Sequence, residues 1–387
     1  MLLLACGSAE TTPPGIHSAP RNVAAKAALW TVDCHGGADF ADVRSAIATA
    51  ASGDQITVAP CTYYGSLDLE GKTLEIRGTD PSTTWIYASP GSSVLKVTHG
   101  EGRKTTVQGM TLAGGGGEGE VAAIEVSFSA LTLRDVHVRD NVGFVTIYGR
   151  SAHLLIEDSV VSNNQPTLGI VVLARRGEIV VQDSSIECGV ATAGYQSEHG
   201  SALIDGATID CPAGRSIEIF HAPGRVQRSF LRGALYVENE GSGDEATVVK
   251  GSVLASGASV VNSDLVLENV VSTGGLSSTS STLSLTATVV MGEACAITAS
   301  GSSISTSYAV FWGHTTLACG FSDPLTRDAT SMAVDPQFVS AATEDFHLAA
   351  DSPLANAGPS SASYSDPDGT RSDIGVYGGH FSMGGGW

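Results

Sequence analysis

A short box of apolar, polar and apolar residues recurs along the chain and constrains its fold more than any other feature. Copies begin at positions 107, 133, 156, 181, 204, 226, 249 and 267, and weaker copies lie near Thr286 and Ile304. Successive copies are therefore separated by roughly 20 residues, a period typical of architectures in which each repeat stacks on its neighbour.

The pattern within and between the boxes indicates a stack of strands. Alternation within each box predicts a strand, and the Gly, Asn, Asp and Ser residues between boxes predict turns. An interval of this length accommodates two or three short strands with their turns. An antiparallel sandwich also has short strands and frequent turns, but recurrence in the same phase favours parallel stacking. The sequence therefore predicts an all-β parallel solenoid.

Composition excludes several classes of protein. The 387 residues include 40 acidic and 20 basic side chains, for a net charge of −20. This charge argues against a nucleic-acid partner and against docking on anionic lipid. With 42% hydrophobic residues and a mean hydropathy of +0.13, the chain is too apolar to be disordered. No apolar run approaches the length of a membrane span.

The N-terminal segment 1–28 is predicted to be a lipoprotein-like terminus followed by a linker. Leu3-Leu4-Ala5-Cys6 resembles a bacterial lipobox, and residues 10–21 have the Thr, Pro and Ser composition of a tether. The apolar stretch is short for a signal peptide, which a misassigned start would explain. The alternative is an ordinary apolar terminus with a spare cysteine. The favoured interpretation makes Cys6 the lipidation site of an outer-membrane lipoprotein. The protein would then contact the membrane only through this lipid.

The remaining six cysteines are predicted to form three disulfides. Cys188 and Cys211 each follow a box at the same distance, so stacking places them one turn apart. Cys295 and Cys319 are separated by a similar interval, and Cys34 pairs with Cys61 by elimination. Buried free thiols are the alternative. Three bridges imply an oxidising, extracytoplasmic compartment, for a protein that is either anchored or secreted.

Both ends of the solenoid are predicted to carry caps. Residues 39–52 read as an amphipathic helix with Asp39 as N-cap and Val43, Ile47 and Ala51 on one face. A strand over 54–58, a turn at Tyr63-Tyr64 and the segment 71–78 follow.

This order resembles the N-terminal cap and first turns of right-handed parallel β-helix proteins of the pectate-lyase-like superfamily. The tail, with Asp335-Pro-Gln-Phe338 and Asp366-Pro-Asp368, is similar to the C-termini of bacterial secreted members. The resemblance covers about residues 30 to 380 and implies a right-handed parallel β-helix with a helical N-terminal cap and an irregular C-terminal cap. The expected organisation is linker 1–28, β-helix with its N-terminal cap 29–322 and C-terminal cap 323–387. Because this superfamily hosts many activities, fold alone does not give function.

Candidate binding residues lie on a second set of strands. Apolar residues recur at every second position of the segments 144–148, 170–173, 217–220 and 235–238. These apolar residues, Val145 and Ile170 among them, are expected to point inward. The outward set combines aromatic rings with acids and arginines, which suits an extended polysaccharide or cell-surface glycan. The predicted substrate-binding residues are Tyr148, Arg150, Arg175, Phe220 and Tyr236.

Glu218 and Glu238 are the catalytic candidates. Near one turn apart, they could approach each other and form an acid–base pair. An ordinary solvated sheet face is the competing interpretation. The superfamily's Asn-Thr-Asp, Gly-His-Gly and Trp-x-Asp-His motifs are absent, so no residue inherits a catalytic role. The predicted function is a secreted cell-surface protein that binds a polysaccharide and, if an enzyme, is a lyase or glycoside hydrolase. The alternative is a non-catalytic adhesin or structural stalk.

Two acidic patterns raise the question of calcium. Asp135, Asp158 and Asp183 recur in phase, with Asn269 in the same slot, and a turn-capping ladder is favoured over stacked calcium ligands. In the tail, Asp366, Asp368 and Asp373 alternate around a glycine as calcium loops do. A plain turn with aspartate caps is the alternative there. Calcium is the one cofactor that the sequence suggests.

Overall fold

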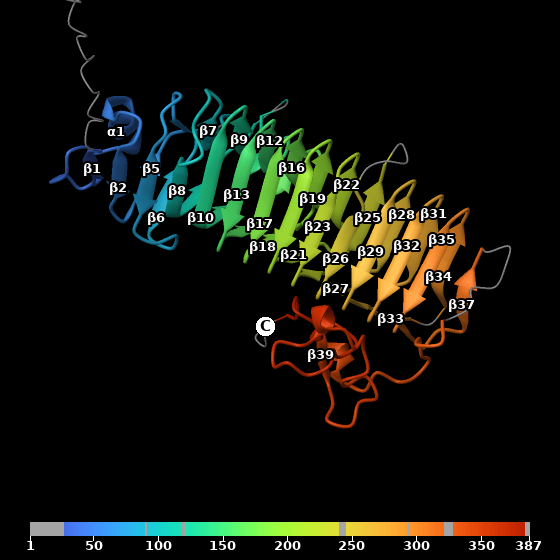
Figure 1. The fold of residues 1–387 in the computed structure, drawn as a ribbon. Coiled ribbons are helices and arrows are strands. Elements are labelled where there is room, and N and C mark those ends of the chain that lie inside the picture. The colour runs from blue at the N-terminus through green and yellow to red at the C-terminus, as the bar shows by residue number, and fades with distance from the viewer. Residues whose placement is uncertain are drawn as a thin grey trace, which may run out of the picture.

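The chain forms a right-handed parallel β-helix of about 12 turns, as the sequence predicts (Figure 1). The computed structural model describes residues 27–89, 91–117, 119, 121–239, 245–292, 294–320 and 328–383. The predicted lipidation site Cys6 lies outside the described residues.

Each turn contributes strands to three parallel sheets, here named I, II and III. Strands β8 and β10 run round a corner and belong to both I and II. Sheet I contains β1 (Leu29–Val32), β2 (Gln55–Val58), β5 (Glu75–Gly78), the first halves of β8 (Thr106–Ala113) and β10 (Ala130–Arg139), β13 (His153–Glu157), β17 (Glu178–Gln182), β20 (Ser201–Asp205), β23 (Gly224–Gln227), β26 (Thr247–Lys250), β29 (Asp264–Glu268), β32 (Thr282–Thr286) and β35 (Ser303–Ser307).

Sheet II contains β3 (Cys61–Tyr64), β6 (Thr84–Tyr87), the second halves of β8 and β10, β14 (Val160–Ser162), β18 (Ser185–Glu187), β21 (Thr208–Asp210), β24 (Phe230–Leu231), β27 (Val253–Leu254), β30 (Val271–Ser272), β33 (Val289–Met291) and β36 (Val310–Trp312). Sheet III contains β4 (Leu67–Asp68), β7 (Leu95–Val97), β9 (Ile124–Ser127), β12 (Ile147–Arg150), β16 (Ile170–Arg175), β19 (Ala193–Glu198), β22 (Arg215–Phe220), β25 (Ala234–Glu238), β28 (Ala258–Val261), β31 (Leu276–Thr279), β34 (Cys295–Ser300) and β37 (Thr316–Cys319). The short strands β11 (Val142–Gly143) and β15 (Gln165–Pro166) pair with each other.

The recurring box is a corner between two strands, which corrects the single strand expected there. Its first two residues end a strand of sheet I and its last two begin a strand of sheet II. The third residue of the box takes a left-handed conformation, with φ of 50° at Asp135, 49° at Asp158 and 45° at Asp183. Asp and Asn tolerate this conformation better than most residues. The in-phase aspartates therefore mark where the chain turns.

The predicted aspartate ladder is replaced by a serine ladder one residue further along. The side chains of Asp135, Asp158 and Asp183 are exposed. The serines that follow such corners are buried, and each hydroxyl accepts a backbone N–H from the preceding turn. The bonds are Val136 N to Ser159 Oγ (3.1 Å), Ser159 N to Ser184 Oγ (3.0 Å), Ala207 N to Ser229 Oγ (3.2 Å) and Ser229 N to Ser252 Oγ (3.1 Å).

Replacing Ser229 with alanine tests this ladder. The change leaves the buried Ala207 N–H and the Gln227 carbonyl without their hydroxyl partner. We expect the free energy of unfolding to fall by about 1–3 kcal/mol, the cost of a buried unpaired polar group. Denaturant titration measures it, with Ser185→Ala on the half-buried outer side as the control, expected to change stability by less than about 0.5 kcal/mol. Equal effects would contradict the ladder.

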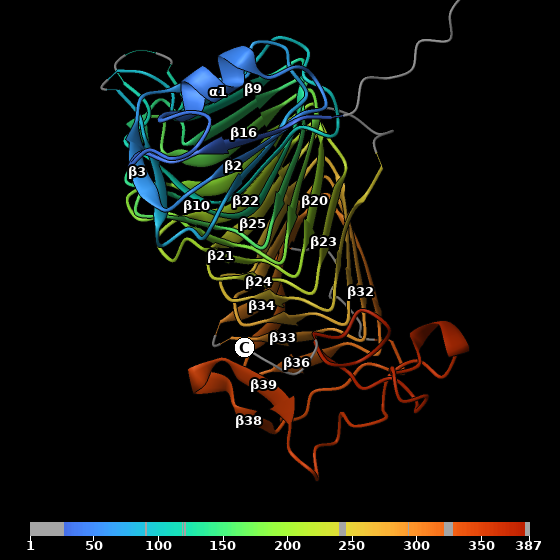
Figure 2. The same cartoon turned by 90° about the vertical axis from the view of Figure 1, so that its left-hand side faces the viewer.

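A short helix, α1 (Val43–Thr49), lies at the N-terminal end of the stack (Figure 2). Its N-cap is Asp42, whose carboxylate accepts the Ser45 N–H. Asp39, the expected cap, instead bonds the backbone and hydroxyl of Thr31. Val43 and Ile47 are buried as expected, but Ala51 is exposed. The expected turn at Tyr63-Tyr64 is the end of strand β3.

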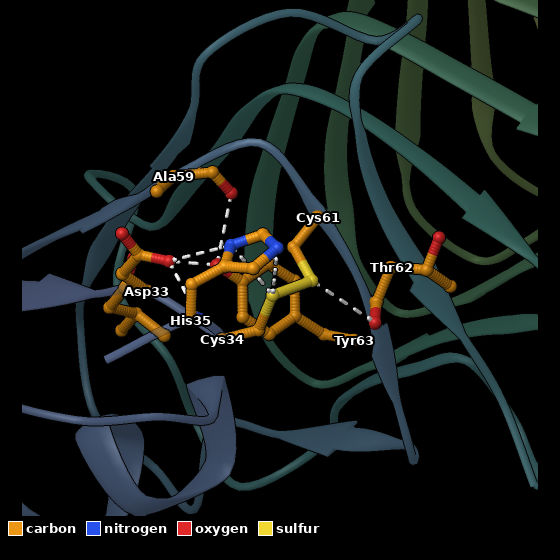
Figure 3. The surroundings of a disulfide bond; sticks show 8 residues. Asp33, Cys34, His35, Ala59, Cys61, Thr62 and Tyr63 are labelled. Carbon is orange, nitrogen blue, oxygen red and sulfur yellow. Dashed lines mark hydrogen bonds and ion pairs between the residues drawn. A yellow bond between two sulfur atoms is a disulfide. The ribbon is translucent and has the colours of Figure 1, made fainter.

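The three disulfides join the predicted pairs. Cα–Cα distances are 6.4 Å for Cys34–Cys61, 5.1 Å for Cys188–Cys211 and 6.2 Å for Cys295–Cys319, all within the range that a disulfide spans. Figure 3 shows the first bridge, which ties the end of β1 to the start of β3 beside His35 and Tyr63. Among the described residues no helix has the length and apolar character that crossing a membrane requires.

The C-terminal segment packs on the outer side of sheet II. It contains β38 (Phe338–Ser340), η1 (Ala341–Thr343), β39 (Asp345–Leu348) and η2 (Ala362–Tyr364). Phe346, Leu354 and Ile374 form a second core with Val271 and Val289 of the last turns. Asn269 fixes the segment further, because its side-chain amide donates to the Asp373 and Gly375 carbonyls. Figure 1 shows it beneath the C-terminal half of the stack.

Candidate functional site

Strands β12, β16, β19, β22 and β25 bring every predicted binding residue to one outer surface, here called the central face of sheet III. The core side of these strands is filled by residues such as Ile147, Val172, Tyr195, Ile217 and Leu235, all fully buried. Cross-strand register aligns the outward residues in two columns. The columns are Tyr148, Leu173, Gln196, Glu218 and Tyr236, then Arg150, Arg175, Glu198, Phe220 and Glu238.

The first part of the face carries a cluster of arginines. Arg150 lies directly opposite Arg175 on the neighbouring strand, and Arg176 follows at the corner. Arg175 donates to Glu198 over 2.7 Å, and this bond raises the arginine's pKa. The Arg150 guanidinium lies 5.6 Å from the Phe128 ring, and within the described ranges it has no carboxylate partner. Arg150 and Arg176 therefore carry positive charge at this part of the surface, beside the paired Arg175 and Glu198.

The second part of the face is a half-buried network around Tyr236. The Arg215 guanidinium lies 3.8 Å from the Tyr236 ring centroid and donates to Glu218 over 2.7 Å. The Tyr236 hydroxyl donates to Glu238 over 2.7 Å, and burial followed by this acid raises the pKa of the tyrosine. Phe220 packs beside it at 5.7 Å between centroids. These bonds hold the rings in fixed positions.

Glu218 and Glu238, which are expected from the sequence to approach each other, are not cross-strand partners. Register places Glu218 opposite Tyr236 and Glu238 opposite Phe220, so the two acids occupy diagonal positions. The Glu218 carboxylate accepts a hydrogen bond from Arg215, and the Glu238 carboxylate accepts one from Tyr236. Catalysis by this pair stays a prediction, and the geometry favours a role in positioning the neighbouring cation and ring.

Two inward assignments are wrong. Val145 and Ile170 are buried in a small separate cluster with Leu173, which belongs to an outward column. The strand β12 begins only at Ile147, so alternation counted back to Val145 gives the wrong side. This cluster supports the half-buried Tyr148 from beside.

Sequence reasoning missed several members of the face. Gln196 donates to Glu198 over 2.7 Å and so extends the arginine–acid chain. His199 and His221 stack at 4.7 Å between ring centroids at the adjoining corner. The alternation in Tyr195-Gln-Ser-Glu198, one repeat before Ile217-Glu-Ile-Phe220, is the signal that would have identified β19.

The tail acids lie apart from this face and bond to nearby backbone. Asp366 accepts the Gly379 and Asp373 N–H groups, Asp368 accepts that of Thr370, and Asp373 accepts that of Asn356. Burial raises the pKa of Asp366. Among the described residues, the acid and histidine groupings close enough for a metal are Asp68–His99–Glu101 and the disulfide-bonded Cys34–Cys61 beside His35. Glu101 already accepts bonds from Gly71, His99 and Ser129.

Removal of divalent ions tests the predicted calcium loop. Because each tail carboxylate is already bonded to backbone, we expect EDTA to leave the melting temperature unchanged. Differential scanning calorimetry with and without the chelator, followed by added Ca²⁺, measures this. A fall that Ca²⁺ restores, and that is absent in Asp368→Asn, would establish the calcium site instead.

Comparison with known proteins shows similarity of fold. No family model and no curated protein matches the chain. The structure is similar to that of pectate lyase Pel9A, with 13% identity and a TM-score of 0.47, covering 90% of this chain and 96% of that one. It is also similar to the PL6 alginate lyase AlyGC, with 13% identity, a TM-score of 0.49 and coverage of 79% and 54%. A third similar structure is the A-module of the Azotobacter vinelandii mannuronan C-5 epimerase AlgE6. It has 13% identity and a TM-score of 0.41, and the match covers 76% of this chain and 94% of that one. At these values the likeness establishes neither activity nor substrate.

Proposed function

We propose that the central face of sheet III binds an extended anionic polysaccharide of the uronate type. The main support for this proposal is the pair Arg150 and Arg175, which lie directly opposite each other on adjacent strands. Arg176 follows Arg175, and Arg175 already bonds the Glu198 carboxylate. Guanidinium groups bind carboxylates through paired, charge-assisted hydrogen bonds. Adjacent strands repeat at roughly 4.8 Å, so the face offers regularly spaced contacts to a polymer.

Aromatic rings supply the second kind of contact. Tyr148 lies between the arginine cluster and the apolar Leu173 cluster, and Tyr236 with Phe220 lies further along the face. Rings of this kind bury the apolar faces of sugars while their edges accommodate hydroxyls. The combination of ring faces and guanidinium groups matches the apolar face and the carboxylate of a uronate sugar.

Binding without turnover is the form of this proposal that the geometry supports best. Glu218 and Glu238 hold Arg215 and Tyr236, and they are not cross-strand partners. This favours an adhesin-like role over the lyase or hydrolase that the sequence leaves open. A structural stalk without any ligand is the remaining alternative.

One set of incubations separates these functions. The protein is mixed with hexamers of α-1,4-galacturonate and β-1,4-mannuronate, and calorimetry, absorbance of unsaturated products and reducing-end formation are followed. We expect binding of an anionic hexamer that weakens as salt rises, without new product. Product formation would establish an enzyme, and absence of binding to either hexamer would leave the stalk.

We further propose an extracytoplasmic location. Three disulfides support it, since such bonds persist in oxidising compartments. A lipid anchor at Cys6 remains part of this proposal. Mass spectrometry of the N-terminal peptide after expression in bacteria tests it: diacylglycerol on Cys6 is expected, and an unmodified Cys6 would rule it out.

A further inference from the structure

A hollow lies at the corner between sheets II and III, in the first turns of the solenoid. Its volume is about 450 Å³. The residues that line it are Tyr87, Ala88, Gly91, the glycine loop 114–117, Asp140, Val142 and Thr167. Tyr87 belongs to β6, a strand of sheet II. None of the lining residues lies on the strands β12, β16, β19, β22 and β25 that form the central face.

Exposed aromatic rings mark the rim of this hollow. Tyr87 is 41% exposed and Tyr64, its register partner on β3, is 72% exposed, with ring centroids 6.2 Å apart. Val142 is 53% exposed on the lining. Large apolar side chains gathered on a solvent-facing surface indicate a binding site more than a structural need.

The glycine loop packs closely against the Tyr87 ring and against the neighbouring turn. A Cβ on Gly114 would lie 2.5 Å from the Tyr87 ring, and its φ of +69° also favours glycine. A Cβ on Gly116 would meet the Val142 carbonyl. The loop backbone therefore lies directly against the Tyr87 ring, and a ligand would contact the part of the ring that remains exposed.

The polar groups of the lining favour an uncharged ligand rich in hydroxyls. Asp140 accepts a bond from Arg139 over 2.9 Å and another from Asn163. The Arg139 charge is therefore already compensated, while the carboxylate retains acceptor capacity for hydroxyl donors. An aromatic wall with one such acceptor suits a ring that has an apolar face and hydroxyl edges.

We propose that this hollow binds one pyranose ring of a neutral polysaccharide, stacked on Tyr87 with a hydroxyl donated to Asp140. The site is independent of the anionic-glycan face. The protein would thus have two glycan sites of different charge preference on the same solenoid.

Calorimetry with neutral hexamers tests the proposal. The native protein is titrated with cellohexaose, laminarihexaose and maltohexaose, each raised to about 10 mM, where Kd values in the millimolar range are measurable. We expect at least one to bind. Tyr87→Ala is expected to weaken binding about tenfold, whereas Tyr87→Phe, which keeps the ring, is expected to preserve it.

Two further variants keep the result decisive. Trp312→Ala removes an exposed aromatic at the same corner in a distant turn and is expected to leave binding unchanged. Should Tyr87→Ala melt early, Asp140→Asn tests the hydroxyl contact with the ring in place. No binding of any neutral hexamer, or equal binding by native protein and folded Tyr87→Ala, would overturn the proposal.

Discussion

Tyr195→Ala is expected to lower the free energy of unfolding by about 3–5 kcal/mol, the cost of removing a large buried ring. Tyr195 is fully buried in the middle of the core, between Val172 and Ile217 of the adjacent turns. Burial raises its pKa, and its hydroxyl donates to the Ile179 carbonyl over 3.4 Å. The substitution therefore opens a cavity and removes the hydroxyl's bond to that carbonyl.

Denaturant titration followed by circular dichroism measures this effect. Tyr195→Phe keeps the ring and should lose about 1 kcal/mol. Tyr148→Ala removes a half-buried tyrosine of the outer face and should cost less than Tyr195→Ala. If the two alanine variants were equally unstable, the assignment of the two sides of sheet III would be contradicted.

The double substitution Arg150→Ala, Arg175→Ala is expected to weaken binding of the anionic hexamer about 30-fold. That figure corresponds to about 2 kcal/mol, or about 1 kcal/mol for each hydrogen-bonding group lost at an exposed site. Since both guanidinium groups lie on neighbouring strands of the central face, they can contact successive sugars. Calorimetry at about 50 and 300 mM salt should also show a smaller salt dependence in the variant.

Arg225→Ala is a control for the loss of a positive charge elsewhere on the solenoid. Arg225 is exposed on sheet I, so its loss changes the net charge without touching the central face. We expect its affinity to remain close to that of the native protein. A loss as large as that of the double variant would mean that overall charge, and not the central face, determines binding.

The solenoid and the Cys188–Cys211 disulfide could be predicted because both depend on phase, whereas the prediction of the other two pairs rests on interval and on elimination. A box that returns in the same phase requires stacking, whatever the length of the turns between copies. Cys188 and Cys211 occupy the same position after their boxes, so stacking brings them together. The outward position of Tyr148 and Tyr236 follows from alternation over strands that are intact.

The features that could not be predicted depend on where each strand begins and which residues turn the chain. Asp135 looks like one polar position in an alternating strand, yet its left-handed conformation carries the chain to another sheet. Val145 precedes its strand, so alternation does not apply to it. The diagonal placement of Glu218 and Glu238 depends on a cross-strand register interrupted by an irregularity between Arg215 and Ile217, which one sequence does not reveal.

A crystal structure of the protein with a bound uronate hexamer tests the central claim most directly. We predict a sugar chain lying across β12 to β25, with its carboxylates bonded to Arg150 and Arg175 and sugar rings against Tyr148 and Tyr236. A hexamer bound elsewhere, with the central face of sheet III bare, would contradict the account.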